Sequence, residues 1–431
     1  MFLIRVTHKE LMPGVRLTAV HINKFKSSHF GVTLLTPLDR EHAAQNALLA
    51  WVLRRGSRMY PDMQAISAAL DELYGGAVEP LVTKKGESQC VGFVASFLDD
   101  AYALKGEPIL EAAAQLLGEL LLHPCTQNGV FKEEYVESER GNLIDRIRAQ
   151  MNDKRQYSMS RLAREMCRDE AFGVDKLGDE EHARAITPAT LWQRYQALLS
   201  TARVELYYCG SAEPERVEQA LLRAFADLPV NENREQPACQ VRANADASGP
   251  KIVEERLDVT QGKLAMGFRT GGISVRDEEF PALLLMNAVF GGTSMSKLFM
   301  NVREKLSLCY FASSGLERIK GLMLVSSGIE FEKYQQARDE ILAQLEACRR
   351  GEITCDELEG ARRIVVTALR TTLDSQSRMA DYWLGQAVAG LEESPEELAA
   401  RVEGVTADQM VKVAGKLELD TIYFLKGKEG A

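Results

Sequence analysis

The spacing of histidines and glutamates decides whether this chain could hold a catalytic metal. A zinc-dependent hydrolase that holds its metal on a helix needs two histidines on one helix face and a nearby glutamate. The histidines bind the metal, and the glutamate activates the metal-bound water. The six histidines form no His-x-x-Glu-His, His-Glu-x-x-His or His-x-x-x-His arrangement; they are His8, His21, His29, His42, His123 and His182. The pair Glu41-His42 is one histidine short. We therefore expect surface or hydrogen-bonded structural histidines and no metal ligands.

Composition and charge exclude several other classes of function. Of the 431 residues, 45% are apolar and 26% are charged, which is typical of a globular protein and not of a disordered one. The formal charge of −10 argues against nucleic acid as a partner, because neutralising phosphates requires a basic surface. Apolar runs stay below the roughly eighteen residues that cross a bilayer, which predicts no membrane partner.

The amino terminus and the cysteines indicate a compartment. No basic segment precedes the apolar start at residues 1–6 and no small-residue cleavage site follows a long apolar stretch, which predicts no signal peptide. The eight cysteines are scattered without a Cys-x-x-Cys pair, which favours reduced thiols in a chain of this size. We expect a cytoplasmic protein.

The elements that would position a site occur in the same order twice. The first half predicts strands at 16–22 and 31–35, helices at 43–54 and 62–74, two strands within 78–98, helices at 108–122, 130–167 and 189–200, a strand at 204–209 and a helix at 214–225. The second half predicts strands at 251–255 and 263–268, helices at 278–290 and 294–305, strands at 307–314 and 322–329, helices within 332–417 and a strand at 421–425. Residues 230–250 are polar and aperiodic, which is typical of a linker. We therefore predict homologous domains at 1–229 and 251–431.

This duplicated order resembles the M16 peptidase family (pitrilysin/insulinase-type, M16B). The matching segments are residues 49–56 and 70–75, Lys84-Lys85-Gly86-Glu87, Gly291-Gly292-Thr293-Ser294, residues 298–305 and Tyr310. The resemblance covers nearly the whole chain. It implies an α+β fold of two M16-type domains, each an antiparallel-rich mixed sheet covered by helices.

The same resemblance implies that the zinc site of active members is absent. Aligning the segment that ends at Gly56 places Ala47 and Trp51 at the two histidine ligands and Ala50 at the general base. On a later helix, Arg146 takes the position of the glutamate ligand, seven residues after Glu139. None of these four side chains can bind zinc or move a proton. The chain is then no enzyme by itself and needs no cofactor, and zinc is expected only in a partner chain.

A second pair of residues matches the family and is retained. In active assemblies an arginine and a tyrosine seven residues apart hold the substrate backbone near the zinc, and Arg303 and Tyr310 stand at that spacing. A guanidinium donates paired hydrogen bonds, and a tyrosine hydroxyl can donate to a developing oxyanion. The alternative is structural: Arg303 pairs with a glutamate at a helix end, and Tyr310 packs on the core.

The sequence from residue 55 to residue 86 is most similar to the zinc-less YmfF-like branch of the family. That branch occurs beside an active YmfH-like peptidase and is named for association with elongation factor P modification. The resemblance implies a non-catalytic subunit that supplies Arg303 and Tyr310 to the zinc site of a YmfH-like partner acting on a peptide. A scaffold of the same fold with no role in proteolysis is the alternative, and a peptidase with a relocated metal is a third hypothesis.

Overall fold

The computed structural model describes residues 4–428, so the amino-terminal reading above begins on residues outside this range. Contacts divide the chain into two compact units. Unit 1 comprises the described residues up to Arg148, Val174–Ala238 and Gln376–Gly390. Unit 2 comprises Ala149–Gly173, Cys239–Ser375 and the described residues from Leu391 onward. Each unit therefore contains one segment from the opposite half of the sequence.

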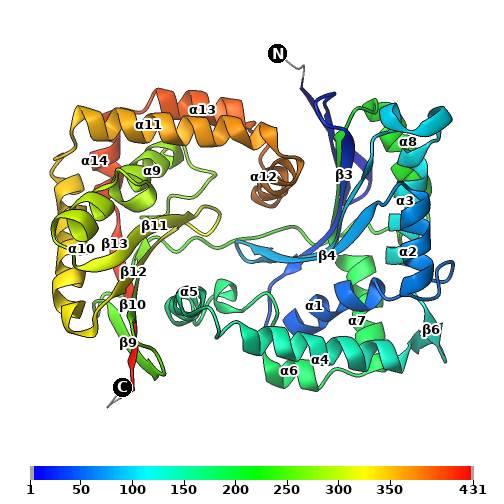
Figure 1. The fold of residues 1–431 in the computed structure, drawn as a ribbon, viewed down its shortest axis with the longest axis horizontal. Helices are drawn as coiled ribbons and strands as arrows, with labels where there is room; N and C mark the ends of the chain where they lie inside the picture. The colour runs from blue at the N-terminus through cyan, green and yellow to red at the C-terminus, as the bar shows by residue number, and fades with distance from the viewer. Residues whose placement is uncertain (1–3, 429–431) are drawn as a thin grey trace. The chain divides into compact units, whose positions relative to one another are not determined.

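Unit 1 is built on a six-stranded sheet with the strand order β1-β2-β8-β3-β5-β4 (Figure 1). The strands are β1 (Arg5–Met12), β2 (Val15–His21), β3 (Ser27–Pro37), β4 (Ala77–Lys85), β5 (Ser88–Leu98) and β8 (Arg203–Gly210). Strands β2 and β8 pair in parallel, and every other neighbouring pair is antiparallel. The sheet is therefore mixed and rich in antiparallel pairs, as predicted.

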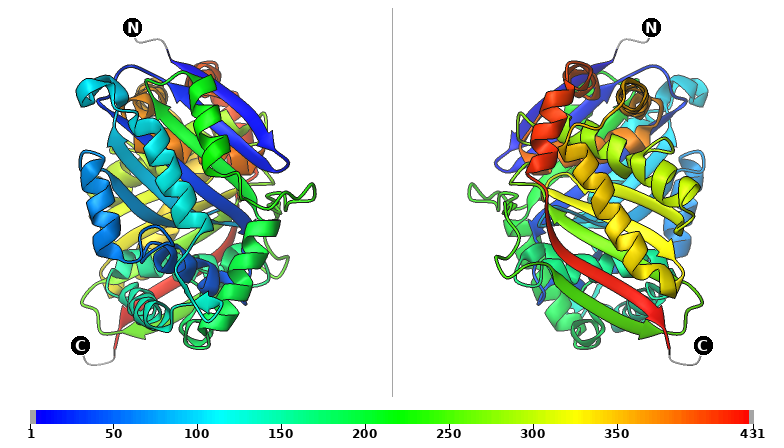
Figure 2. Two further views of the ribbon diagram at one scale, coloured as in Figure 1. Left: turned by 90° about the vertical axis from the view of Figure 1, so that its right-hand side faces the viewer. Right: turned by 90° about the vertical axis from the view of Figure 1, so that its left-hand side faces the viewer.

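Alternation along the strands of unit 1 gives its sheet two different faces. On β3 the buried side chains Phe30, Val32 and Leu34 join the main core, while His29 and Thr33 point to the opposite face. Helices α3 and α8 lie over the core face (Figure 2), and α12 covers the other. The helices of unit 1 are α1 (Ala43–Leu53), α2 (Met63–Glu72), α3 (Ile109–Leu122), α4 (Glu133–Ala149), α6 (Glu180–Arg184), α7 (Pro188–Thr201), α8 (Pro214–Ala224) and α12 (Gln376–Ala389).

Unit 2 repeats this plan with a five-stranded sheet, in the order β11-β12-β10-β13-β9. The strands are β9 (Lys251–Leu257), β10 (Gly262–Arg269), β11 (Cys309–Glu317), β12 (Leu322–Ile329) and β13 (Glu418–Gly427), and β13 pairs with β9 in parallel. The helices are α5 (Lys154–Met166), α9 (Phe280–Asn287), α10 (Tyr334–Arg349), α11 (Cys355–Arg370), α13 (Pro395–Glu403) and α14 (Ala407–Gly415). Two π-helical segments, η4 (Ala288–Gly292) and η5 (Leu298–Lys305), follow α9.

Helix α5 covers one face of the unit 2 sheet. Its Leu162 and Met166 are buried against Ala265 of β10 and Tyr423 of β13. The close approach depends on Gly267 of β10, where an added Cβ would lie 2.5 Å from the Met166 sulfur. Each sheet thus receives a cover helix, α12 or α5, from the other half of the sequence.

The structure differs from the predicted elements in three main places, and the short elements β6 (Thr126–Gln127), β7 (Val130–Phe131) and α6 were also not predicted. The predicted helix at 130–167 is two helices, because the Asp153 side chain accepts hydrogen bonds from the backbone N–H groups of Arg155 and Gln156 and so begins α5 separately. The predicted α-helix at 294–305 is π-helical over Leu298–Lys305. Strand β1 was not predicted, since its residues lack clear alternation.

Three further observations bear on the sequence analysis. No helix within residues 4–428 is long and apolar enough to cross a membrane. Within the same range no cysteine forms a disulfide: Cys90, Cys167, Cys209 and Cys348 are buried, and Cys355 is exposed. Residues 229–250 contain neither helix nor strand, although Arg234 is buried there with its guanidinium donating to three backbone carbonyl oxygens.

Candidate functional site

The first candidate site lies on helix α1 of unit 1, where the sequence places three positions of the zinc motif. Nearly every residue of α1 is buried, and Ala47 and Ala50 are both 0% exposed. Ala47 belongs to the main hydrophobic core, and Trp51 follows one helical turn later and packs against that core. The segment that would carry a metal in active relatives is therefore a close-packed core helix.

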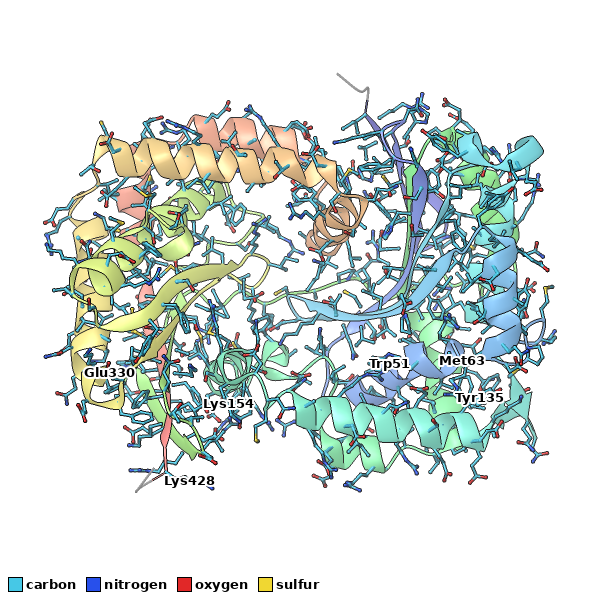
Figure 3. All side chains as sticks on the ribbon, in the orientation of Figure 1. Trp51, Met63, Tyr135, Lys154, Glu330 and Lys428 are labelled. Carbon is cyan, nitrogen blue, oxygen red and sulfur yellow. The ribbon has the colours of Figure 1, made fainter. Side chains whose placement is uncertain are left out.

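Helix α4 carries the fourth position of the zinc motif, Arg146, and brings it next to Trp51 of α1. The guanidinium carbon of Arg146, in the last turn of α4, lies 4.3 Å from the centre of the Trp51 ring (Trp51 is labelled in Figure 3). This is a cation–π contact, which contributes about 0.5–1 kcal/mol where the cation is solvent-exposed, as Arg146 is. Trp51 and Arg146 are 95 residues apart in the sequence, and the resemblance assigns them to metal ligands on two different helices. In the fold the two side chains are in contact.

The nearest buried carboxylate on α4 is already engaged. Glu139 is buried and accepts hydrogen bonds from Arg55 Nη1 and from Asn142 Nδ2, both at 3.1 Å. The Arg55 guanidinium also lies over the Tyr135 ring at 5.1 Å. Its neighbour Arg140 donates to the Ile186 carbonyl oxygen at 2.7 Å. These contacts engage the Glu139 carboxylate, whereas the buried Nε of Arg55 has no hydrogen-bond partner.

The residues at this place do not fit a zinc ion. Two methyl groups, an indole and a guanidinium offer no lone pair to a metal, and the cation would repel one. Within residues 4–428, no group of three or more His, Cys, Asp or Glu side chains could hold a metal ion. Three histidines instead pair singly with aspartates: His42 with Asp39, His123 with Asp227 and His182 with Asp179.

The second candidate site is an irregular segment of unit 2 that runs from η5 into β11. Lys297 pairs with Glu357 of α11 at 2.9 Å, and Asn301 donates to Gln344 of α10 at 2.7 Å, so that the π-helix is anchored at two points. After the helix, Ser307 adopts a left-handed conformation with φ of 48°. π-Helices and strained residues of this kind occur most often at functional sites.

Tyr310 occupies a β-bulge in this segment. Cys309 pairs with Ile329 and Phe311 with Gly328, so Tyr310 is the extra residue of the edge strand β11. A bulge turns its side chain away from the regular alternation, and Tyr310 is 59% exposed. The structural alternative for Tyr310, packing on the core, is therefore wrong.

Arg303 lies on η5, seven residues before Tyr310, and its side chain is partly exposed. Its guanidinium carbon is 4.7 Å from the Phe299 ring centre, and Nη1 is 3.5 Å from a carboxylate oxygen of the adjacent Glu304. This contact to a glutamate near the end of η5 is the one that the structural alternative for Arg303 describes, and the Arg303 side chain is 41% exposed. Three further large apolar side chains are exposed on the same segment: Met295, Met300 and Leu306.

The structure thus brings Trp51 and Arg146 together in unit 1, and it places Arg303 and Tyr310 on one continuous exposed segment of unit 2. The roles assigned to these residues remain predictions. The bulge at Tyr310 and the π-helix were missed, because a change of hydrogen-bond register leaves no mark in residue type. The Arg55–Glu139 contact was also missed, since it joins residues 84 positions apart.

Comparison with known proteins places this geometry in a family. The family model described as "Peptidase M16 inactive domain" matches residues 185–365. The "Probable inactive metalloprotease YmfF" of Bacillus subtilis (strain 168) is 35% identical over 418 residues, covering 97% of each chain. The "Uncharacterized zinc protease YmxG" of the same organism is 21% identical and covers 86% of this chain and 90% of that protein.

Solved structures share the fold. A conserved protein from Enterococcus faecalis V583 superposes with a TM-score of 0.89 at 28% identity, covering 99% of each chain. A peptidase M16 inactive domain from Pseudomonas fluorescens superposes with a TM-score of 0.79 at 17% identity, covering 98% of each chain. These structures confirm the predicted α+β fold.

Proposed function

This chain belongs to the peptidase M16 family as an inactive metallopeptidase homologue, and we propose that it is the non-catalytic subunit of a heterodimeric zinc peptidase. In this proposal a zinc-bearing YmfH-like M16 chain supplies the metal. The chain described here supplies Arg303 and Tyr310, which hold the peptide substrate. The proposal depends on one observation. The Arg303 and Tyr310 side chains are accessible, whereas the four positions assigned to the metal site in unit 1 leave no room or ligand for a metal.

The four zinc-motif positions on α1 and α4 of unit 1 support the first half of the proposal. Ala47 and Ala50 are fully buried, and the cation of Arg146 lies over Trp51. No local rotamer change provides a metal ligand at these four positions, because none of the side chains carries a suitable donor atom. In this proposal, water activation comes from another chain.

The η5–β11 segment supports the second half. A guanidinium can donate two parallel hydrogen bonds to carbonyl oxygens of an extended peptide, which fixes the position of the peptide backbone. The Tyr310 hydroxyl can donate to a carbonyl oxygen as negative charge develops on it. The exposed Met295, Met300 and Leu306 offer apolar contact area for a peptide or for the partner chain.

The proposal includes a place of action. The chain has a net charge of −10 and free cysteines, which suit a reducing cytoplasm. We extend the proposal to a cytoplasmic heterodimer whose biological role is connected with elongation factor P modification, as the resemblance to the YmfF-like branch implies.

The test uses the chain and its zinc-bearing partner, purified separately and then mixed. We expect neither the chain alone nor its Arg303→Ala variant to cleave a quenched fluorescent peptide. The mixture should cleave it, and Arg303→Ala should lower kcat/KM of the mixture about ten- to hundredfold, since a hydrogen bond to a charged group is lost. Arg338→Ala is the matched control, because Arg338 also pairs with an adjacent acid and lies over an aromatic ring.

Pairing is measured in the same samples by analytical ultracentrifugation. Arg303→Ala should leave the complex intact, so that lost cleavage reports substrate holding and not lost assembly. Equal cleavage by the mixtures with native chain and with Arg303→Ala would show that Arg303 does not hold the substrate. Equal cleavage by the partner alone would show that the chain is a scaffold without a role in proteolysis.

A further inference from the structure

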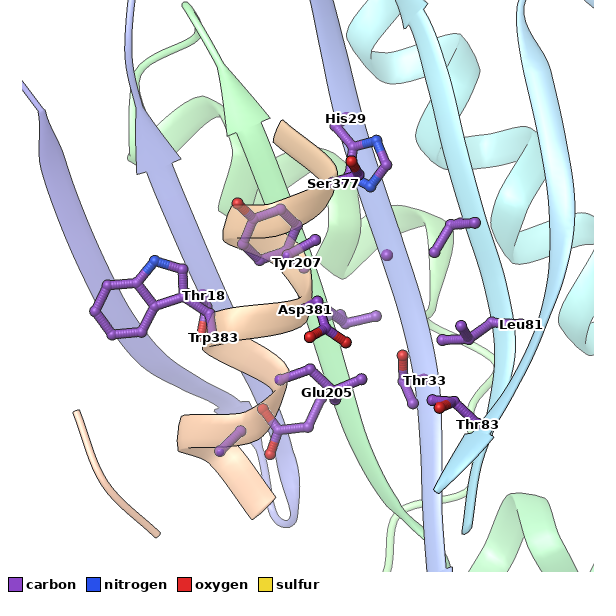
Figure 4. Close-up of a pocket in the computed structure, with 16 residues that line it drawn as sticks. Thr18, His29, Thr33, Leu81, Thr83, Glu205, Tyr207, Ser377, Asp381 and Trp383 are labelled. Atoms are coloured by element: carbon purple, nitrogen blue, oxygen red, sulfur yellow. The ribbon is translucent and has the colours of Figure 1, made fainter. Parts of the chain in front are cut away.

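A cavity of about 160 Å³ lies in unit 1 between its sheet and the cover helix α12 (Figure 4). Small residues create it on both sides. Gly31 of β3 leaves the centre of the sheet face without a side chain, and Ser377, Ala380 and Ala387 line the helix side. The cavity is open on one side, where Ser377 and Asp381 of its lining are exposed.

Two buried polar atoms at this cavity are incompletely paired. Nε2 of His29 has no hydrogen-bond partner. The hydroxyl of Tyr207, a residue only 7% exposed, meets only the Cys209 thiol, which is a weak hydrogen-bonding group. The two rings lie edge to face with their centres 6.2 Å apart, and both residues line the cavity. Buried polar groups are normally paired, so an unpaired atom and a weakly paired one at the same cavity indicate a missing occupant.

The charges in the lining restrict that occupant. Glu205 accepts a hydrogen bond from Arg203 Nε at 2.6 Å, and Asp381 accepts one from Lys85 Nζ at 2.7 Å. Both charged residues of the lining are therefore acidic and already paired within unit 1. An anion would be repelled by the two carboxylates. A cation would find no free carboxylate to offset its desolvation.

The equivalent interface in unit 2 shows that such a hollow can be filled by the chain itself. Under α5, the Met166 side chain occupies the space that Gly267 leaves on the sheet. Under α12, the helix presents Ser377, Ala380 and Ala387 to the cavity, and none of its atoms comes within 4 Å of the Cβ position of Gly31. The difference lies in the helix side chains and not in the plan of the unit.

We propose that the cavity under α12 binds a small, uncharged, mostly apolar molecule of about the size of a phenol, with one hydroxyl group. An engineered apolar cavity of about 150 Å³ binds benzene, so the volume suits a single ring. The hydroxyl of the ligand donates to Nε2 of His29 or exchanges a hydrogen bond with the Tyr207 hydroxyl. Burial lowers the pKa of His29, which keeps its imidazole neutral and able to accept.

The test titrates the full chain with phenol, toluene and benzoate by isothermal calorimetry. We expect saturable binding of phenol with a Kd of about 1 mM or tighter, weaker binding of toluene and none of benzoate. Trp383 lines the cavity, so phenol should change its fluorescence, and Trp383→Phe should remove that change. Tyr207→Phe should weaken phenol about three- to tenfold and leave toluene unchanged.

Ala380→Leu fills the cavity and should abolish binding of both phenol and toluene. Ala68→Leu is the matched control, because it adds the same side chain at an exposed position of α2 outside the cavity. If phenol does not saturate the chain, or binds Ala380→Leu and Tyr207→Phe as well as the native protein, the cavity is not a ligand site. Benzoate binding as tightly as phenol would contradict the uncharged ligand.

Discussion

Two regions of this molecule carry the residues that the resemblance assigns to the family's active site, and they have opposite local structures. In unit 1, α1 and α4 are regular helices; Ala47 and Ala50 of α1 are fully buried, and Trp51 of α1 contacts Arg146 of α4. In unit 2, the η5–β11 segment combines a π-helix, a left-handed Ser307 and a bulge, and it exposes Tyr310. Regular, closed packing serves stability, whereas strain and exposure persist where the surrounding fold holds them in place. At the assigned positions, the alanines of unit 1 are packed in a core, whereas Tyr310 of unit 2 is exposed.

The two cover helices extend this comparison to charge. Under α12, burial raises the pKa of Glu205, and its pairing with Arg203 offsets that effect only in part. Beside α5, burial would raise the pKa of Glu170, but hydrogen bonds from Arg269 and Lys320 outweigh burial and lower it. The ionised Glu205 carboxylate therefore destabilises the folded state, whereas the ionised Glu170 carboxylate stabilises it.

The largest expected effect is on the closed region of unit 1. Ala47→His places an imidazole where a methyl group is 0% exposed, and we expect it to lower the free energy of unfolding by about 3 kcal/mol through overpacking and an unpaired polar group. Urea unfolding measures the change. Ala68→His on the exposed face of α2 should change it by less than about 0.5 kcal/mol. Equal stability of the two variants would show that α1 is not closed.

The next effect concerns the exposed region of unit 2. Tyr310→Phe should lower the cleavage rate of the mixture with the zinc-bearing partner about hundredfold, because a donor to the developing oxyanion is lost. The unfolding free energy should stay unchanged, since the side chain is exposed. Tyr102→Phe removes another exposed hydroxyl and serves as the control. A loss of stability without a loss of rate would assign Tyr310 to structure.

A smaller effect separates the two carboxylates. At neutral pH, Glu170→Gln should cost about 2 kcal/mol of stability, whereas Glu205→Gln should gain about 1 kcal/mol. The contribution of Glu170 is present above the unfolded pKa of about 4.3 and is lost as the pH falls through its lowered folded pKa. The penalty of Glu205 is absent below the unfolded pKa and grows as the pH rises through its raised folded pKa. Unfolding at several pH values measures both, and changes of the same sign would contradict the assignment.

The smallest effect tests the contact that joins α1 to α4. Arg146→Ala should lower the free energy of unfolding by about 0.5–1 kcal/mol, since a solvent-exposed cation–π contact is lost. A double-mutant cycle with Trp51→Leu isolates the pairwise part. A coupling energy of zero would mean that the two side chains do not interact in solution.

The sequence predicts the fold well where periodicity is local. The predicted bounds of α1, α2 and α3 differ from the observed ones by at most two residues, and both sheets were expected as mixed and antiparallel-rich. It cannot predict which sheet a helix covers, because the placement of α5 and α12 depends on contacts between residues more than 100 positions apart. The bounds 1–229, 230–250 and 251–431 remain predictions.

The candidate sites likewise include residues that the sequence predicts and a feature that it could not predict. Residue types alone exclude metal binding at Ala47, Ala50, Trp51 and Arg146, and a resemblance of motifs is enough to find Arg303 and Tyr310. The cavity under α12 could not be predicted. The alternation of small and large residues in β3 is visible, but nothing in the sequence tells that alanines from residue 380 onward lie over Gly31.

Zinc content of the purified chain tests the central claim most directly. The chain is dialysed against buffered zinc, separated from free metal by gel filtration and analysed by mass spectrometry for metal per polypeptide. We predict far less than one bound zinc ion per chain, with the partner binding one under the same conditions. One zinc ion per chain, unchanged by Arg146→Ala and lost in a histidine variant such as His42→Ala, would contradict it.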